Sequence, residues 1–414
     1  MKVVDNELLN RELISKIGIG NDRHPMFCAS PILLGEKVFN GLLTQQTLIN
    51  QFYNIVGQIG KLAIKGEMEG IVKTILFSEV VAGMDIAYHR ELDDFAWEPP
   101  LFYRTDQSVD GKIFEIQAPG SGWGDLPLIK KILNDLGVID NLSALDFEQK
   151  YISAYRKLTD KQYPHVGYFL DASSNPISMR YLLAVTHNEI GYWGMDANVL
   201  MDDLDCVVAH SASALTTLNY FQKYYEKATH KELRFILPPN LLFDQKSIYL
   251  LPFLEETKHF FTDEIRQIFP YTTYICDDKF RLENGEYISI DNFIALPSSQ
   301  RRYYLKYGGP DTNKNWGSKS IYRLNRSDCQ ILLNMARELS TKGEIWLIQK
   351  DITSLSDRTS LDYSADLNNI IADGNHIKLS AFYTPFDYLG CKVMFRKHFK
   401  VHGQNDTYTG LGIR

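Results

Sequence analysis

The chain has 414 residues and carries 44 lysines and arginines against 51 aspartates and glutamates, which gives a formal net charge of −7. This acidic balance excludes a basic protein that wraps nucleic acid. Apolar residues make up 44% of the chain and charged residues 23%, so the composition is that of a globular protein. At roughly 100–200 residues per domain, the length predicts two or three structural units.

The cysteines and the N-terminal segment indicate the compartment. Five cysteines are spread over the chain without a CxxC pair or a metal-ligand spacing, so we expect reduced core residues. The N-terminal segment has a charge every few residues, and no window approaches the roughly 20 apolar residues that a membrane span needs. These features predict a soluble, cytoplasmic protein without membrane or nucleic-acid partners.

The first predicted elements are a long helix and a hairpin. Apolar residues recur every three to four positions from Gly41 to Ala63, which predicts an amphipathic helix in a mainly helical region that extends to about residue 100. Between Leu101 and Gly124, two short alternating runs flank Asp110-Gly111, a pattern typical of a β-hairpin. A Pro/Gly-rich loop then leads to a helix expected over Leu126 to Leu136.

The middle of the chain predicts a small parallel α/β unit. His165 to Asp171 is an apolar run typical of a buried strand, and turn residues after it lead into a helix expected to continue through Ile190. Asp205 to Ala209 is a second strand candidate. Strand, helix and strand at this spacing favour parallel pairing.

The last hundred residues predict a further sheet. Tyr303 to Gly309 is a strand that enters a glycine-containing loop, and Trp316 to Leu324 alternates as a returning strand. A helix is expected from Arg326 to Leu339, and a strand from Glu344 to Ile352. The run from Cys391 to Val401 alternates again, and we expect it to join the same sheet.

The hairpin carries the first group of candidate site residues. Arg104 and Asp106 share one strand, while Glu115 and Gln117 share the other, so alternation with period two puts each pair on one face. If the register brings these faces together, two carboxylates and an amide oxygen converge beside a guanidinium, a ligand set that suits Mg²⁺. The alternative, which this pattern favours on its own, is a set of solvated polar residues on the outer face of a hairpin.

Two later segments carry candidate nucleotide contacts. Lys306 ends a strand before the loop from Gly308 to Gly317, and an ammonium with exposed backbone N–H groups can hold phosphates. The alternative is a hairpin turn that needs glycines for positive φ. The strand from Glu344 to Ile352 ends in a polar connector that can bind an adenine edge. The alternative there is an ordinary core strand.

The order of these segments resembles the ATP-grasp ligases, specifically the circularly permuted branch that includes glutathionylspermidine synthetase-like enzymes. The resemblance rests on order rather than on any single motif. Two residues depart from the family pattern, since Gln117 stands in place of an asparagine and Gln349 takes a hinge position that is often acidic. The segments that carry the resemblance are RTD…FEIQAPGSG (Arg104–Gly122), HVGYFLD to VVAH (His165–His210), LPPNLLFDQKSIYLLPFLE (Leu237–Glu255), FPYTTYI (Phe269–Ile275), YLKYGGPDTNKNWGSKSIYRL (Tyr304–Leu324) and IWLIQKDI (Ile345–Ile352).

The resemblance implies an α/β (α+β) fold that is ATP-grasp-like and circularly permuted. It implies an N-terminal helical region over residues 1–100 and a metal-binding hairpin and helix over residues 101–160. A Rossmann-like substrate domain would follow over residues 161–240, and a nucleotide-binding segment would occupy residues 241–414.

The resemblance also implies ATP and Mg²⁺ as cofactors and assigns roles to residues. Arg104 and Lys306 are the implied catalytic residues. The implied metal ligands are Asp106, Glu115 and Gln117. The implied nucleotide contacts are Lys246, Lys306, Gly308, Gly309, Gly317, Ser318, Gln349, Lys350, Ile352 and Arg396.

The implied activity is that of an ATP-dependent, ADP-forming carboxylate–amine ligase that works through an acyl-phosphate. Its substrates would be a small carboxylate and an amine, with amino acids and peptides among the candidates, and the negative charge mildly favours neutral or cationic acceptors. A small-molecule kinase, a noncatalytic nucleotide-binding scaffold and a carbohydrate-active enzyme stay open as alternatives, as does a homo-oligomer. An acidic ATP-binding chain must gather its cations, so we expect one cleft to hold Arg104, Lys246, Lys306 and Arg396.

Overall fold

The computed structural model describes residues 26–28, 31–68, 70–77, 89–117, 122–135, 137, 146–169, 177–195, 198–209, 211–309, 311–315, 319–352, 361–362, 376–398, 400–401 and 407–414. The chain divides into two compact units. Unit 1 comprises Met1–Thr47, Pro100–Pro239 and Leu355–Arg414, and unit 2 comprises Leu48–Pro99 and Asn240–Ser354. No helix in the described part of the chain is long and apolar enough to cross a membrane.

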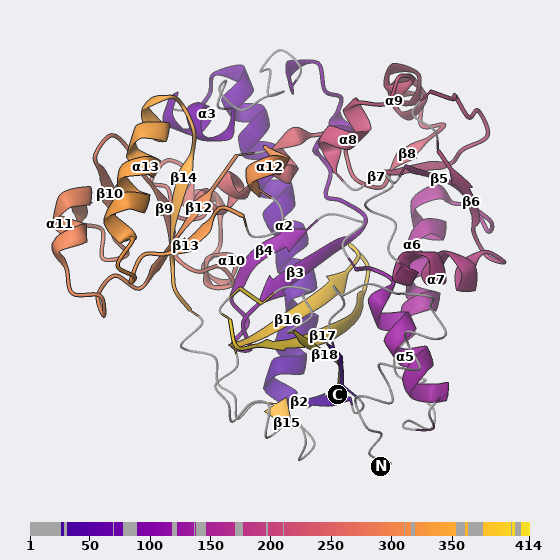
Figure 1. Ribbon diagram of the computed structural model, residues 1–414. Coiled ribbons are helices and arrows are strands. Elements are labelled where there is room, and N and C mark those ends of the chain that lie inside the picture. Colours follow the sequence, from indigo (N-terminus) through magenta and orange to yellow (C-terminus); the bar gives the residue numbers. More distant parts are fainter. Residues whose placement is uncertain are drawn as a thin grey trace. The chain divides into compact units, whose positions relative to one another are not determined.

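The larger sheet of unit 1 joins the early hairpin to the end of the chain (Figure 1). Its order is β15-β2-β18-β17-β16-β3-β4, and β1 also pairs with β18. The strands are β1 (Met26–Phe27), β2 (Ile32–Leu34), β3 (Tyr103–Gln107), β4 (Ile113–Gln117), β15 (Leu361–Asp362), β16 (His376–Tyr383), β17 (Tyr388–Arg396) and β18 (Tyr408–Ile413). The hairpin β3–β4 confirms the strand pair predicted around Asp110-Gly111.

The prediction that the run from Cys391 to Val401 joins the sheet of the strand with Lys306 is wrong. This run lies mainly in β17, which pairs with β16 on one edge and with β18 on the other. Both edges of β17 are therefore occupied, and it shares no sheet with the strand that carries Lys306.

The second sheet of unit 1 is parallel, with the order β6-β5-β7-β8. It confirms the parallel α/β unit that the strand–helix–strand spacing predicts. The strands are β5 (His165–Phe169), β6 (Gly191–Gly194), β7 (Cys206–Ala209) and β8 (Arg234–Phe235), and the helices of this region are α7 (Ile177–Thr186), α8 (Ala212–Thr216) and α9 (Phe221–Thr229).

Two further helices, α5 (Asp125–Asp135) and α6 (Phe147–Thr159), join the two sheets of unit 1 through one hydrophobic core. The core contains Ile129 of α5, Tyr151 and Tyr155 of α6, Val166 of the parallel sheet and Phe382 of the larger sheet. Helix α5 confirms the helix expected after the Pro/Gly-rich loop.

Helix α2 (Glu36–Lys65) contains the amphipathic segment predicted from Gly41 to Ala63. Its buried apolar residues recur at three- and four-residue spacing and include Leu42, Ile49, Phe52, Tyr53, Val56, Ile59 and Ala63. Because this spacing keeps them on one side of the helix, one side packs inward and the other stays polar.

Unit 2 contains a four-stranded antiparallel sheet with the order β13-β12-β14-β9. Its strands are β9 (Thr272–Tyr274), β12 (Tyr303–Tyr307), β13 (Ile321–Arg323) and β14 (Trp346–Lys350). The helices α11 (Ile290–Ala295) and α13 (Cys329–Thr341) share a hydrophobic core with β12 and β14. The remaining elements are α3 (Gly70–Leu76), η1 (Asp94–Trp97), η2 (Leu241–Asp244), η3 (Lys246–Leu250), η4 (Lys258–Phe260), α10 (Asp263–Gln267), β10 (Lys279–Arg281), β11 (Tyr287–Ser289) and α12 (Thr312–Asn315).

Candidate functional site

The register of the hairpin brings the two predicted polar pairs together. Arg104 lies directly opposite Gln117, and Asp106 lies directly opposite Glu115. Because directly opposed residues of an antiparallel pair point to the same side of the sheet, all four side chains share one face. The register therefore meets the condition on which the convergence depended, while the roles of these residues in binding stay a prediction.

The carboxylate of Asp106 is buried, with 2% of its surface exposed, and it accepts hydrogen bonds on both oxygens. Arg104 Nε donates to Oδ1 at 3.1 Å, and Ser380 Oγ donates to the same oxygen at 2.8 Å. Lys378 Nζ donates to Oδ2 at 2.8 Å. Gln117 completes the cluster, since its Oε1 accepts from Arg104 Nη2 at 2.5 Å. The cluster is therefore a carboxylate held between two cations.

The charges in this cluster shift its pKa values. Burial alone would raise the pKa of Asp106, but the charges of Arg104 and Lys378, with hydrogen bonds from Lys378 and Ser380, hold that pKa well below its usual range. Burial lowers the pKa of Lys378, and the charges of Arg104 and Lys392 act in the same direction, whereas Asp106 opposes them. The Lys378 ammonium is therefore stabilised by its partner Asp106.

Lys392 extends the cluster along the same face of the sheet. It lies opposite Ser380 on the neighbouring strand, and its Nζ donates to Asp125 Oδ2 at 2.6 Å. Gly122 lies against this pair with a φ of +73°, and a Cβ there would come within 2.7 Å of the Asp125 carboxylate oxygen. Arg396, further along β17, donates to the backbone oxygen of Lys400 at 2.6 Å.

Sequence reasoning missed Lys378, Ser380 and Lys392. The signal was present, because Lys378 and Ser380 alternate with the apolar Ile377 and Leu379 in the way that predicts a strand with one polar face. The alternation does not reveal the strand's neighbour, and it is pairing with β3 that makes these residues part of the site.

The described residues around Asp106 do not fit Mg²⁺. This ion takes near-ideal octahedral oxygen coordination, usually with one or two carboxylates and several waters. Both oxygens of Asp106 already accept from cationic or hydroxyl donors, and the described part of the chain contains no group of three or more His, Cys, Asp and Glu side chains that could hold a metal. Glu115 is half-buried and lies opposite Asp106 in the sheet.

The sheet of unit 2 carries a second polar cluster, on the face opposite its core. Lys306 Nζ donates to Gln349 Oε1 at 2.5 Å, and Gln349 Nε2 donates to Thr272 Oγ1 at 3.1 Å. These residues come from three adjacent strands, and all are buried. The neighbouring residues Leu305 and Ile348 belong to the hydrophobic core on the other face. One sheet therefore separates an apolar face from a face with a lysine and an amide.

Other residues that the resemblance implies as nucleotide contacts lie near the end of β12. Ser247 N–H donates to Gly308 O at 2.9 Å, which places the buried Lys246 beside that strand end. Gly308 N–H donates to Ile345 O at 2.8 Å, and a Cβ at Gly308 would lie 3.1 Å from the Leu347 side chain. The close packing of Leu347 therefore explains why a residue without a side chain stands at position 308. Gly309 follows it in the chain, and Gly317 and Ser318 lie outside the described residues.

The remaining predicted contacts are on or beside β14. Gln349 is hydrogen-bonded to Lys306 and Thr272 within the sheet. The Lys350 side chain forms an ion pair with Glu283, and Ile352 is buried. The adenine-binding role expected for this segment stays a prediction.

A short helix holds part of the loop after Gly309 against the sheet. Lys314 of α12 donates to Glu344 Oε1 at 2.5 Å and lies 5.3 Å above the centre of the Tyr307 ring. Trp346 Nε1 donates to the other carboxylate oxygen of Glu344 at 3.2 Å. Glu344 therefore joins this loop to the strand β14.

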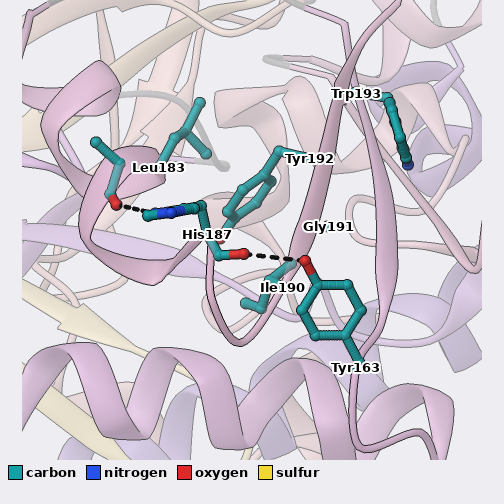
Figure 2. A pocket seen from close by; sticks show the side chains of 8 residues that line it. Tyr163, Leu183, His187, Ile190, Gly191, Tyr192 and Trp193 are labelled. Carbon is teal, nitrogen blue, oxygen red and sulfur yellow. Dashed lines mark hydrogen bonds between the residues drawn. The ribbon is translucent and has the colours of Figure 1, made fainter.

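A pocket of about 430 Å³ opens between α7 and β6 in unit 1 (Figure 2). Tyr163 and Trp193, each about half exposed, line it together with His187. Tyr163 Oη donates to His187 O at 3.0 Å, and His187 Nδ1 lies 2.5 Å from Ala184 O. Its lining is aromatic and aliphatic and includes no lysine, arginine or carboxylate.

Comparison with known proteins supports the fold. No protein-family model matches the chain, and no curated protein matches it. Among solved structures, the chain is similar to a glutathione synthetase-like effector from Globodera pallida in its apo form, at 11% sequence identity and a TM-score of 0.51. The similarity covers 98% of this chain and 96% of that chain. The mixed α/β fold is thus glutathione synthetase-like, which is consistent with an ATP-grasp-like fold.

Proposed function

We propose that this protein is an ATP-dependent carboxylate–amine ligase with an ATP-grasp-like, circularly permuted chain order. The observation that carries the proposal is the position of Lys306, whose ammonium is buried beside Gln349 on the polar face of an antiparallel sheet. A buried ammonium there can neutralise phosphate charge, which is what phosphoryl transfer chiefly needs. The glutathione synthetase-like fold supports the same class.

The proposed reaction has two steps. A carboxylate oxygen of the substrate attacks the γ-phosphorus of ATP, and the bond from that phosphorus to the β-phosphate oxygen breaks, which releases ADP and leaves an acyl-phosphate. The nitrogen of an amine then attacks the acyl carbon, loses a proton and displaces inorganic phosphate. We assign phosphate binding to Lys306 and Lys246, and stabilisation of charge on the acyl-phosphate to Arg104.

A noncatalytic nucleotide-binding scaffold is the second candidate, and one observation favours it. The Asp106 carboxylate, an implied metal ligand, is hydrogen-bonded to Lys378 and Arg104 instead. Phosphoryl transfer depends strongly on metal ions that neutralise developing charge. A protein that keeps the fold but lacks the positive charge of the metal ions would bind the nucleotide without turning it over.

A screen of carboxylic and amino acids with ATP, Mg²⁺ and hydroxylamine separates these candidates. A ligase releases ADP and forms a hydroxamate, because hydroxylamine captures the acyl-phosphate. We expect both products from the wild-type protein, their loss in Lys306→Met, and their retention in Lys342→Met, which removes an exposed lysine of the same unit. ADP release without hydroxamate indicates a kinase. Nucleotide binding without ADP release indicates the scaffold.

A further inference from the structure

The Asp106 carboxylate, an implied metal ligand, is in contact with the ammonium of a lysine. Lys378 lies on β16, whose residue Ser380 faces Asp106 directly across the sheet. Its Nζ is 2.8 Å from Asp106 Oδ2, and the lysine side chain is 7% exposed. The remaining oxygen, Oδ1, accepts from Arg104 and Ser380. Every described contact of this carboxylate is therefore with a donor.

We propose that the Lys378 ammonium occupies the position of a divalent cation at Asp106, so that this centre carries its positive charge without a metal. An ammonium donates hydrogen bonds to carboxylate oxygens at nearly the distance shown here, and it supplies one positive charge where Mg²⁺ supplies two. A cation placed on Asp106 would lie beside both Lys378 and Arg104, and repulsion in this buried environment opposes it.

The alternative is that Lys378 moves away when a metal–nucleotide complex binds. This movement would take a buried ammonium away from its carboxylate partner and would leave Arg104 as the only cation that the described hydrogen bonds give to the buried Asp106. Lys392 lies opposite Ser380 on the neighbouring strand and donates a hydrogen bond to Asp125, so it adds a second lysine charge to the same face of the sheet. The geometry thus favours a fixed lysine.

The inference does not depend on ligase activity, because a scaffold and an enzyme would hold the same charges. Asp106 and Glu115 do not bind a divalent ion in the wild-type protein, and removal of the Lys378 ammonium exposes Asp106 to one.

The test counts Mn²⁺ bound to the full chain by electron paramagnetic resonance, with Mn²⁺ as the probe for an oxygen-ligated divalent site. The proteins are the wild type, Asp106→Asn, Glu115→Gln, Lys378→Ala, the double variant Lys378→Ala/Asp106→Asn, and Lys157→Ala. Lys157 lies in the same unit, in an exposed pair with Asp387 at 3.6 Å. It controls for loss of a lysine next to a carboxylate.

We expect the wild type, Asp106→Asn, Glu115→Gln and Lys157→Ala to bind the same number of Mn²⁺ ions. Lys378→Ala should bind one more, and the double variant should lose that gain. A wild-type site that Asp106→Asn or Glu115→Gln removes overturns the proposal, as does a folded Lys378→Ala that gains no ion. If Lys378→Ala fails to fold, the wild type and Glu115→Gln decide the question, because Glu115 is only half-buried. An absence of nucleotide turnover changes none of these counts.

Discussion

The residues that converge on Asp106 come from distant parts of the sequence. Arg104 precedes it by two positions, whereas Lys378 follows it by 272. A buried carboxylate of this kind is tolerated because cations and hydroxyl groups replace the water it lost. Because the buried carboxylate depends on these partners, removal of any one of them should lower the free energy of unfolding. The two cations and the carboxylate are therefore one structural group as well as a candidate site.

Lys378→Met should destabilise the protein strongly, because it leaves the buried Asp106 carboxylate without its closest cation. Loss of one partner of a buried ion pair typically costs about 3–5 kcal/mol. The free energy of unfolding, measured in urea, gives the difference. The exposed-pair variant Lys157→Met should change it by less than about 1 kcal/mol. Equal effects of the two variants would show that Asp106 does not depend on Lys378.

Stability should also fall in acid through Asp106. Its pKa is lowered in the folded protein, so its contribution is complete above the ordinary aspartate pKa of about 3.9 and is lost as the pH falls below that value. Urea unfolding between about pH 6 and pH 3 should show a decline that is shallower in Asp106→Asn, because that variant lacks the group that binds the proton on unfolding. Parallel declines in the two proteins would contradict this assignment.

Single elements and the pairing of strands close in sequence could be predicted, but the pairing of strands far apart in sequence could not. The hairpin β3–β4 could be predicted because its partners are close in sequence and its turn contains Gly111, which adopts a φ of +86°. The partner of β17 could not, since any alternating strand presents the same hydrogen-bonding edges. The residues Lys378 and Ser380 near Asp106 were missed for the same reason, because they contact Asp106 only through the pairing of β16 with β3.

Helix α2 offers a matched pair of glycines. A Cβ at Gly57 would lie 2.7 Å from the backbone oxygen of Trp97, whereas a Cβ at Gly41 would meet nothing within 4 Å. Gly57→Ala should destabilise the protein by about 1–3 kcal/mol through overpacking. Gly41→Ala, on the exposed side, should stabilise it by about 0.5–1 kcal/mol through helix propensity. Thermal unfolding of both variants tests the packing of η1 on α2, and shifts of the same sign would contradict it.

Each of the two units has a sheet with a buried polar cluster. Unit 1 holds Arg104 and Asp106, and unit 2 holds Lys306 and Gln349. The structure has the mixed α/β fold that the sequence predicts, and the similarity to a glutathione synthetase-like effector is consistent with an ATP-grasp-like fold. The four domain ranges and the single cleft for all cations stay predictions, because motif order fixes neither contact boundaries nor the meeting of distant side chains.

Isothermal titration calorimetry of the full chain with ATP and Mg²⁺ measures whether the protein binds ATP through Lys306. We predict saturable binding by the wild type and about tenfold or greater weakening in Lys306→Met, since a hydrogen bond to a charged group contributes about 1.5–3 kcal/mol. Lys342→Met should bind like the wild type. No binding by the wild type, or equal binding by Lys306→Met, would contradict the claim.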